Sequence, residues 1–296
     1  MLRAALRHYR TAYAGLPREA WLLALALFVN RAGTMVLPFL TLYLTTRIGL
    51  SEAAAGRMIS VYGVGALCGA YVSGRLCDVV GPVRLQMICM FVAAPGYLLV
   101  SLGRSWPTIA LALFGLSLAS EAVRPANATA ITRVTTGANR ARAFALQRLA
   151  LNLGFSIGPA AGGLLATIDF RWLFYVDAAT TLAAGVLLLV TFGWRRAHLP
   201  PRHADPTAPR VSPLRDGPFV AFLGLTLLTM MAFLQFSSTY PLYLYDHFGL
   251  TKPMIGLMFV VNTALIVAAE MPLIQAAKSW PLLRTIGWGS GVACLG

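Results

Sequence analysis

Charged side chains within long apolar stretches are the residues of this sequence best suited to chemistry. Arg31 lies deep in the apolar stretch that begins near Ala20, and Glu121 and Arg124 lie three residues apart in a later stretch. Residues at i and i+3 share a helical face, so this acid and this base can neutralise one another. A self-satisfied structural pair is one interpretation. The other is a protonatable acid beside a fixed cation, which can couple proton uptake to the release of a second solute.

Further polar residues lie within other apolar stretches. Glu270 follows Asn262 by two helical turns and is either a second proton site or a partner of Lys278 at the membrane border. We expect Asp177, near the outer edge of its stretch, to pair with Arg171. The remaining candidates for a substrate and proton pathway are Asn30, Asn152, Gln235, Phe236 and Tyr240. Aromatic groups with a few polar ones suit an amphipathic organic compound.

The composition predicts a membrane protein. Of the 296 residues, 58% are hydrophobic and 11% are charged, and the mean hydropathy is +0.70. Several apolar runs reach the ~20 residues needed to cross ~30 Å of hydrocarbon. The net charge of +14 does not indicate nucleic-acid binding, because the basic residues lie between the apolar runs. The sequence has no metal-ligand spacing, cofactor motif or catalytic constellation, which argues against a membrane enzyme.

The apolar runs predict an all-α polytopic protein with four segments. Residues 1–19 form a cationic amphipathic segment, 20–193 a bundle of six helices, 194–217 a Pro-rich basic linker, and 218–296 part of a second bundle. The predicted spans are Ala20–Thr45, Ala54–Cys77, Arg84–Leu102, Trp106–Ile131, Arg142–Thr167, Arg171–Gly193, Pro218–Tyr245, Pro253–Ala276 and a ninth from near Pro281. Since the ninth stops within its apolar run, we expect a second bundle truncated at its C-terminal end. Most of the 24 lysines and arginines fall on the side of the N-terminus, which predicts a cytoplasmic N-terminus and linker.

An internal repeat relates the start of the first bundle to the start of the second. A register shift of 200 residues aligns eight identical pairs and preserves the order of element types. The pairs are Leu42/Leu242, Tyr43/Tyr243, Leu44/Leu244, Gly49/Gly249, Leu50/Leu250, Gly56/Gly256, Met58/Met258 and Val61/Val261. Duplicated halves with a site between them are typical of secondary transporters.

The turn between the second and third spans carries spaced polar and glycine residues. It reads Gly74-Arg-Leu-Cys-Asp78-Val-Val-Gly81-Pro-Val-Arg84. In a tight turn Asp78 can cap the following helix and pair with Arg84 or Arg75, and Gly81 can supply a left-handed backbone. A capped turn with no further role is the alternative to a functional motif.

The fifth span contains glycines four residues apart around a proline. Gly154, Gly158 and Gly162, together with Gly163, remove side chains from one side of the helix, so that a neighbour can approach its backbone closely. Pro159 removes a hydrogen bond and permits a kink. Helix packing without any functional bias also explains this pattern.

These motifs resemble the major facilitator superfamily, specifically its proton-driven drug-efflux branch. The family signature of the inner turn is Gly-x3-Asp-x2-Gly-Arg-x-Arg. Gly74, Asp78, Gly81 and Arg84 match it, and Pro82 replaces its first basic residue. In the family this turn latches the two bundles in the outward-open state, and its acid, which is Asp78 here, interacts near the eleventh helix. We expect no eleventh helix in this sequence.

The other resemblances lie within spans. The fifth-span glycines around Pro159 are similar to the antiporter motif of exporters, with Ala145 at the position of its earliest glycine. Arg124 resembles the fourth-span arginine that the family uses in proton coupling, although the residues after it differ from the family pattern. Asn30 and Arg31 resemble the opening of related exporters, in which the first span lines the cavity.

The resemblance covers residues 20–296 and implies a carrier that rocks two bundles around a midplane site. It implies export of a small amphipathic compound, drug-like or a metabolite, in exchange for protons across the cytoplasmic membrane, with no cofactor and as a monomer when full length. Two alternatives remain open. One is a proton-coupled importer, against which the antiporter-like glycines argue, and the other is a truncated non-transporting protein or partner subunit.

Overall fold

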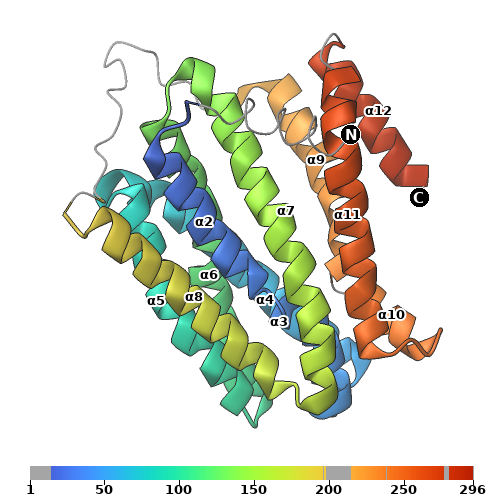
Figure 1. Ribbon diagram of the computed structural model, residues 1–296. Coiled ribbons are helices and arrows are strands. Elements are labelled where there is room, and N and C mark those ends of the chain that lie inside the picture. The colour runs from blue at the N-terminus through green and yellow to red at the C-terminus, as the bar shows by residue number, and fades with distance from the viewer. Residues whose placement is uncertain (1–14, 196, 198–214, 238, 277–279, 296) are drawn as a thin grey trace.

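The computed structural model describes residues 15–195, 197, 215–237, 239–276 and 280–295, and these fold into helices and short connections (Figure 1). The elements are α2 (Arg18–Ala32), α3 (Val36–Leu42), the π-helical turn η1 (Tyr43–Arg47), α4 (Glu52–Val79), α5 (Pro82–Leu102), α6 (Trp106–Val134), α7 (Gly137–Ile168), α8 (Arg171–Phe192), α9 (Gly217–Leu234), the 3-10 turn η4 (Gln235–Ser237), α10 (Thr239–Asp246), α11 (Lys252–Ala276) and α12 (Leu282–Leu295). Six segments between Arg18 and Phe192 are long and apolar enough to cross a membrane. The predicted all-α membrane class is therefore confirmed, while most of the N-terminal segment and most of the linker lie outside the described residues.

Local sequence signals set several helix ends. The hydroxyl of Ser51 accepts a hydrogen bond from the Ala54 N–H at 3.3 Å and caps α4. Ser105 and Thr108 form a capping box at the start of α6. Gly81 has φ 91°, in the left-handed region, as the sequence predicts, and Pro82 then begins α5.

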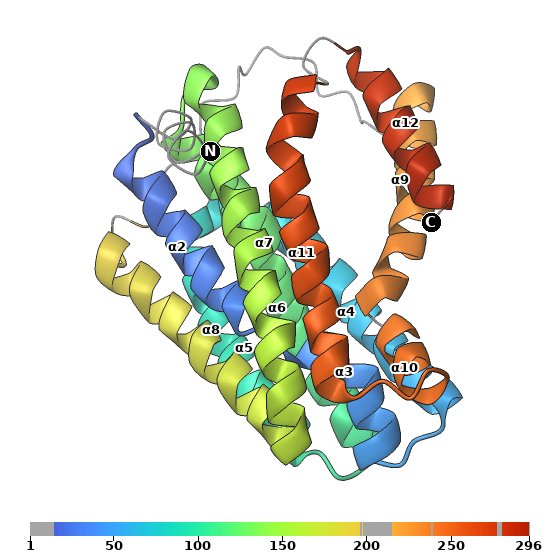
Figure 2. The ribbon, with the colours of Figure 1, turned by 45° about the vertical axis from the view of Figure 1, so that its right-hand side comes forward.

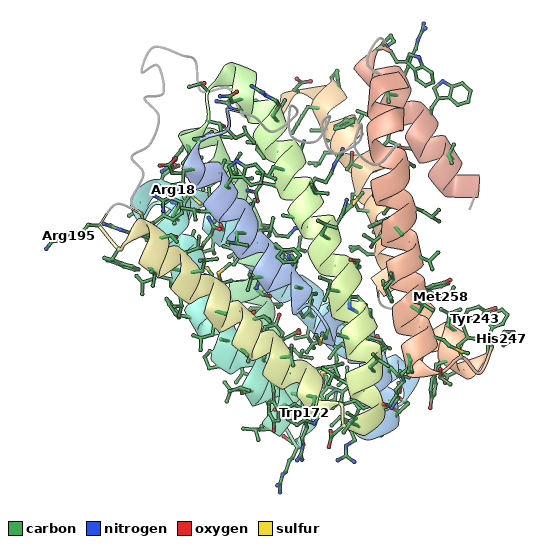
Figure 3. All side chains as sticks on the ribbon, in the orientation of Figure 1. Arg18, Trp172, Arg195, Tyr243, His247 and Met258 are labelled. Carbon is green, nitrogen blue, oxygen red and sulfur yellow. The ribbon has the colours of Figure 1, made fainter. Side chains whose placement is uncertain are left out.

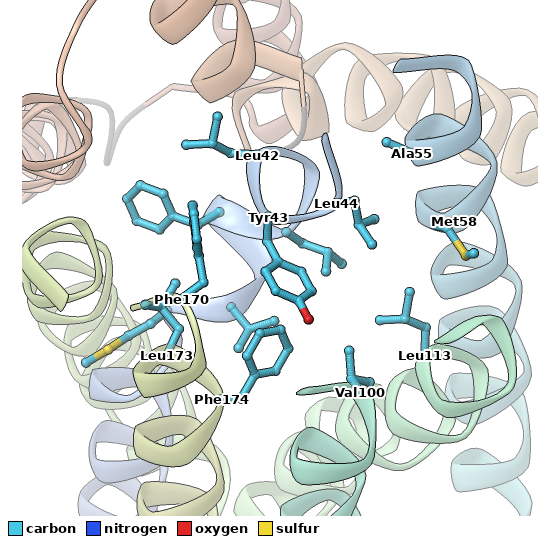
Figure 4. Packing of buried hydrophobic residues seen from close by; sticks show 14 of the residues in the cluster. Leu42, Tyr43, Leu44, Ala55, Met58, Val100, Leu113, Phe170, Leu173 and Phe174 are labelled. Atoms are coloured by element: carbon cyan, nitrogen blue, oxygen red, sulfur yellow. The ribbon is translucent and has the colours of Figure 1, made fainter. Parts of the chain in front are cut away.

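The core of the first half gathers around Tyr43 (Figure 4). Its ring packs edge-on against Phe174 of α8 with 4.9 Å between ring centroids, and the ring centroid of Phe170, the residue before α8, lies 5.8 Å from that of Tyr43. Leu42, Leu44 and other apolar side chains from α4, α5 and α6 complete the cluster. This packing joins the far end of the first span to α8.

The first and seventh spans are both interrupted, whereas the sequence predicts continuous spans. The first breaks at Gly33–Met35, between α2 and α3, and the seventh breaks between α9 and α10. The repeat is preserved at backbone level beyond these breaks. Gly49 and Gly249 have φ of 80° and 62°, and Leu50 and Leu250 donate to Leu44 and Leu244 at 3.0 and 3.1 Å. The two segments that the predicted repeat aligns therefore share the same local backbone geometry at these positions.

The two halves touch at one end. We call the end where α2 begins and α8 ends the linker end, and the opposite end the distal end; Arg18 and Arg195 lie toward the first, and Trp172 toward the second (Figure 3). Lys252, at the start of α11, donates to the Ala166 carbonyl at 3.0 Å and lies 4.1 Å from the Phe170 ring centroid. α10 packs beside α3 at the same end (Figure 2).

Candidate functional site

The break in the first span is closed by a carboxylate from another helix. Asp177 of α8 is 2% exposed, and its two oxygens accept hydrogen bonds from the Met35 N–H at 2.9 Å and the Val36 N–H at 3.1 Å. These are backbone donors at the start of α3 that have no partner within that helix. The predicted pairing of Asp177 with Arg171 is therefore wrong. Asp177 instead caps a helix that begins inside the span.

Two threonines extend this contact along α8. Thr181, one turn from Asp177, accepts a hydrogen bond from the Asn30 side-chain amide at 3.1 Å. The hydroxyl of Thr180 lies so close to Gly33 that a Cβ there would overlap it. Asp177, Thr180 and Thr181 share one helical face, so α8 fixes both sides of the break.

The glycines of the fifth span pack against the same break from the other side. A Cβ on Gly154 would lie 2.7 Å from the Arg31 Cβ, and one on Gly158 would lie 2.6 Å from the Thr34 carbonyl oxygen. A Cβ on Gly163 would lie 2.5 Å from the Lys252 carbonyl oxygen in the second half. The glycine motif therefore lets α7 fit closely between the broken span and α11.

We expect Gly158→Ala to destabilise the fold. Backbone cannot move aside as a flexible side chain can, so the overlap with the Thr34 carbonyl should outweigh the better helix propensity of alanine and cost about 1–3 kcal/mol. Gly115→Ala on α6 is the control, because a Cβ there meets no atom within 4 Å. Thermal unfolding of the two purified variants measures the difference, and equal midpoints would refute close packing at Gly158.

An inner cavity of about 20 Å³ lies beside the break. Its polar lining comes from five helices and includes Asn30, Arg31, Tyr62, Tyr97, Glu121 and Thr181. The Tyr62 hydroxyl donates to Glu121 Oε1 at 3.2 Å, and the buried Nε of Arg31 has no hydrogen-bond partner among the described residues. The volume suits about one water molecule, which would find several polar partners there.

Glu121 connects this inner cavity to a larger cleft. Its Oε2 lies 3.8 Å from Nη1 of Arg124, so the predicted i, i+3 pair forms. The Glu121 side chain is 17% exposed and that of Arg124 is 63% exposed. Arg124 lines an open cleft of about 590 Å³ together with Leu27, Asn127, Phe144, Gln147 and Arg148. The acid thus lines the inner cavity, while its partner lines the cleft.

The cleft lies in the half of the molecule nearer the linker end. Arg124 belongs to the second half of α6 and Arg148 to the first half of α7, and both halves point toward that end. The amide of Asn127 donates to Gln147 Oε1 at 2.9 Å, and Gln147 donates to the Ala20 carbonyl at 3.4 Å. These largely buried amides line the cleft and join α6, α7 and α2.

The other predicted pathway residues lie elsewhere. Gln235 is exposed and accepts a hydrogen bond from the Thr239 hydroxyl. Tyr240 stacks on Phe236, which packs edge-on against Phe259 at 4.7 Å; Phe259 in turn contacts Phe155 of α7. Asn152 is half-buried on α7 and lines neither the inner cavity nor the cleft. The side chain of Glu270 lies outside the described residues.

The inner turn uses different partners from those predicted. Asp78 is 71% exposed and pairs with the largely buried Arg133 of α6 at 2.9 Å, rather than with Arg75 or Arg84, and no side chain caps α5. Arg84 donates to the Trp194 carbonyl at 2.6 Å. Asp78 therefore ties α4 to α6, and Arg84 ties α5 to the start of the linker.

Sequence reasoning missed Asp177 as the cap of the break, Tyr62, Tyr97 and Thr181 as lining of the inner cavity, and Gln147 and Arg148 as lining of the cleft. Asp177 and Gln147 carried a usable signal, because both are polar groups within apolar spans. The tyrosines and Thr181 did not, since such residues occur throughout membrane helices.

Comparison with known proteins gives one family. The model of the Major Facilitator Superfamily matches residues 23–296. The uncharacterized MFS-type transporter YqjV of Bacillus subtilis is 25% identical over 89% of this chain and 66% of its own length. Multidrug resistance protein 1 of Bacillus subtilis is 23% identical over 86% of this chain and 65% of its own length. The chain thus spans about two thirds of the length of these relatives.

Comparison with solved structures gives a fold that agrees with this family. A bacterial homolog of the human lysosomal transporter Spinster, in an inward-facing and unoccupied conformation, superimposes with a TM-score of 0.63 and 18% identity. The match covers 91% of this chain and 63% of that protein. At this identity the likeness concerns the fold alone.

Proposed function

Because the chain belongs to the Major Facilitator Superfamily, we propose that it takes part in exporting a small amphipathic organic compound across the cytoplasmic membrane in exchange for protons. Glu121, Arg124 and Arg31 form the proton-coupling centre of this proposal, and the cleft is its substrate site. The named multidrug resistance relative supports export of this kind of compound. The antiporter-like glycines around Pro159 support the same direction of transport.

One observation carries the proposal. Glu121 lines the polar inner cavity and also pairs with Arg124, which lines the cleft. Protonation of Glu121 removes its negative charge and weakens its attraction for Arg124. A ligand in the cleft and a proton in the cavity therefore act on the same ion pair, which is the physical requirement for coupling the two.

The arrangement of the halves supports alternating access. They touch at the distal end through α7, α11, α3 and α10, and the cleft lies toward the linker end. We place the linker end and the N-terminus in the cytoplasm, because most basic residues lie on that side. In this placement the cleft faces the cytoplasm, from which an exported compound enters. Residues 20–193 and 218–296 then act as the two moving units, with 194–217 as the connection.

The cleft supports an amphipathic substrate. Its volume falls within the range of sites for drug-sized molecules. Leu27, Phe144 and Leu151 offer apolar contact, whereas Arg124 and Arg148 offer cationic hydrogen-bond donors. A polar compound without an apolar body would leave the side chains of Leu27, Phe144 and Leu151 without an apolar contact.

Everted membrane vesicles containing the protein test proton exchange. An acidified lumen should drive uptake of at least one of three amphipathic dyes, the cation ethidium, the anion fluorescein and the neutral Nile red, and this uptake should partly collapse the pH gradient. For one proton exchanged, a gradient of one pH unit supports about a tenfold concentration ratio. Vesicles without the protein are the control. Dye moving out of the lumen together with protons would indicate symport and contradict the proposal.

A further inference from the structure

Lys252 occupies a helix position that does not favour a cation. It is the first residue of α11, and the start of a helix carries a partial positive charge. The equivalent residue of the internal repeat is Glu52, the first residue of α4, whose negative charge suits that position. The local preference is met in the first half and broken in the second, which indicates that a contact outside α11 compensates for the unfavourable charge.

The compensating contact lies in the other half of the molecule. Nζ of Lys252 donates a hydrogen bond to the Ala166 carbonyl oxygen at 3.0 Å. Ala166 belongs to the last turn of α7, which ends at Ile168. Carbonyl groups in the last turn of a helix lack partners within it and form the negative end of the helix dipole. Lys252 of the second half thus caps the C-terminal end of a helix in the first half.

An aromatic ring forms the second part of this contact. Nζ of Lys252 lies 4.1 Å from the centroid of the Phe170 ring, within the range of a cation–π interaction. Phe170 is 5% exposed, and its ring packs near Tyr43 in the core of the first half. The ring is therefore held by the first half and does not follow α11 if the two halves separate.

The backbones of α7 and α11 approach each other closely at this point. A Cβ on Gly163 would lie 2.5 Å from the Lys252 carbonyl oxygen, and one on Gly256 would lie 2.5 Å from the Pro159 carbonyl oxygen. Figure 1 and Figure 2 show the two helices side by side toward the distal end and farther apart toward the linker end. The Lys252 side chain therefore reaches the first half because the distal end is closed.

We propose that Lys252 stabilises the state in which the distal end is closed, by joining α11 to the C-terminal end of α7 and to the Phe170 ring. The inference rests on the proposed alternating access, in which the halves separate at this end. Separation withdraws the ammonium group from the Ala166 carbonyl and the ring and leaves it beside the positive end of α11. Lys252 thus shifts the equilibrium toward the state whose cleft is open at the linker end.

Charge reversal at Lys252 tests the inference. Lys252→Glu introduces the residue type that the repeat has at Glu52, so it suits the start of α11, but the carbonyl end of α7 repels it. We expect the ratio of open to closed distal ends to rise by at least about tenfold. Lys252→Arg keeps the cation and its donors, and its ratio should stay within about threefold of the parent.

Distances between two spin labels measure this ratio. Pulsed electron paramagnetic resonance of the full chain in lipid nanodiscs uses cysteines introduced at Arg104 and Asp246, with the native cysteines replaced by alanine. Both positions are exposed at the distal end, the first in the turn between α5 and α6 and the second at the end of α10. Arg57→Glu, at an exposed position near the start of α4, is the matched control and should leave the ratio unchanged.

The outcomes separate this inference from the proposed function. If Lys252→Glu and the parent show the same ratio of two distances, the inference fails while alternating access stands. If neither shows a second distance in acidic or in alkaline buffer, the halves do not separate at this end, and both fail. The thermal unfolding midpoint of Lys252→Glu should stay within a few degrees of that of Lys252→Arg. A larger loss would overturn the inference, because Lys252 would then hold the fold itself rather than one state of it.

Discussion

Asp177→Ala is expected to lower the free energy of unfolding by about 3–5 kcal/mol, because the Asp177 side chain accepts two hydrogen bonds from buried backbone N–H groups that would lose their acceptors. Alanine leaves the N–H groups of Met35 and Val36 without these acceptors in a part of the chain that water does not reach. The α2/α3 break then loses its cap. Thermal unfolding of the purified protein in detergent would show the loss as a lower midpoint.

Two further variants separate the cap from a general effect of removing an acid. Asp177→Asn keeps one acceptor but turns an amide NH2 toward a backbone donor, so about half of the loss is expected. Asp169→Ala removes a hydrogen bond to the Arg171 N–H that is open to solvent, and it should cost only about 1 kcal/mol. If Asp177→Ala and Asp169→Ala are equally stable, Asp177 does not hold the break.

Local sequence signals were sufficient for the membrane class and for much of the backbone. Apolar runs long enough to cross a bilayer located six helices, and the glycine spacing located a close helix contact. Gly81 adopts a positive φ in the predicted turn. Gly49 and Gly249 do so at equivalent points of the repeat. In each case the chemistry that determines the structure lies within a few residues of the feature itself.

The interruption of the first span could not be predicted in this way. Gly33 lies at the break, and Pro38 follows it and removes a hydrogen bond to the Thr34 carbonyl, but glycine and proline are both common within membrane helices. The cap that stabilises the break comes from Asp177, on the sixth span, so the break depends on tertiary contact. Asp78 is a similar case, because its partner Arg133 lies on a different helix from the nearby arginines that the sequence favoured.

The candidate site shows the same difference between features set within one helix and features that depend on contacts between helices. The Glu121–Arg124 pair could be predicted because both residues lie on one helix at a spacing that brings them together. Their separation into an inner cavity and a cleft could not, since it depends on side chains from other helices, such as Tyr62 and Gln147. The roles of Glu121 and Arg124 in transport are predictions, and transport assays of variants test them.

Glu121→Gln is expected to reduce transport driven by a pH gradient roughly 100-fold or more, to the level of vesicles without protein, because the variant has no carboxylate to bind and release the proton. Glutamine has nearly the same shape and still offers Tyr62 an oxygen acceptor. The variant should therefore reach the membrane and unfold within a few degrees of the parent. Everted vesicles with an acidified lumen measure its transport, using whichever probe the parent protein accumulates.

A matched acid outside the site shows whether the loss is specific. Glu52, exposed in the first turn of α4, lies at the distal end, away from both the inner cavity and the cleft. Glu52→Gln removes the same charge by the same substitution and should transport as the parent does. Tyr62→Phe, which deletes the hydrogen bond to Glu121 but keeps the carboxylate, should retain coupling with an altered dependence on pH. Full transport by Glu121→Gln would remove this acid from the mechanism, because a group that never titrates cannot carry the coupled proton.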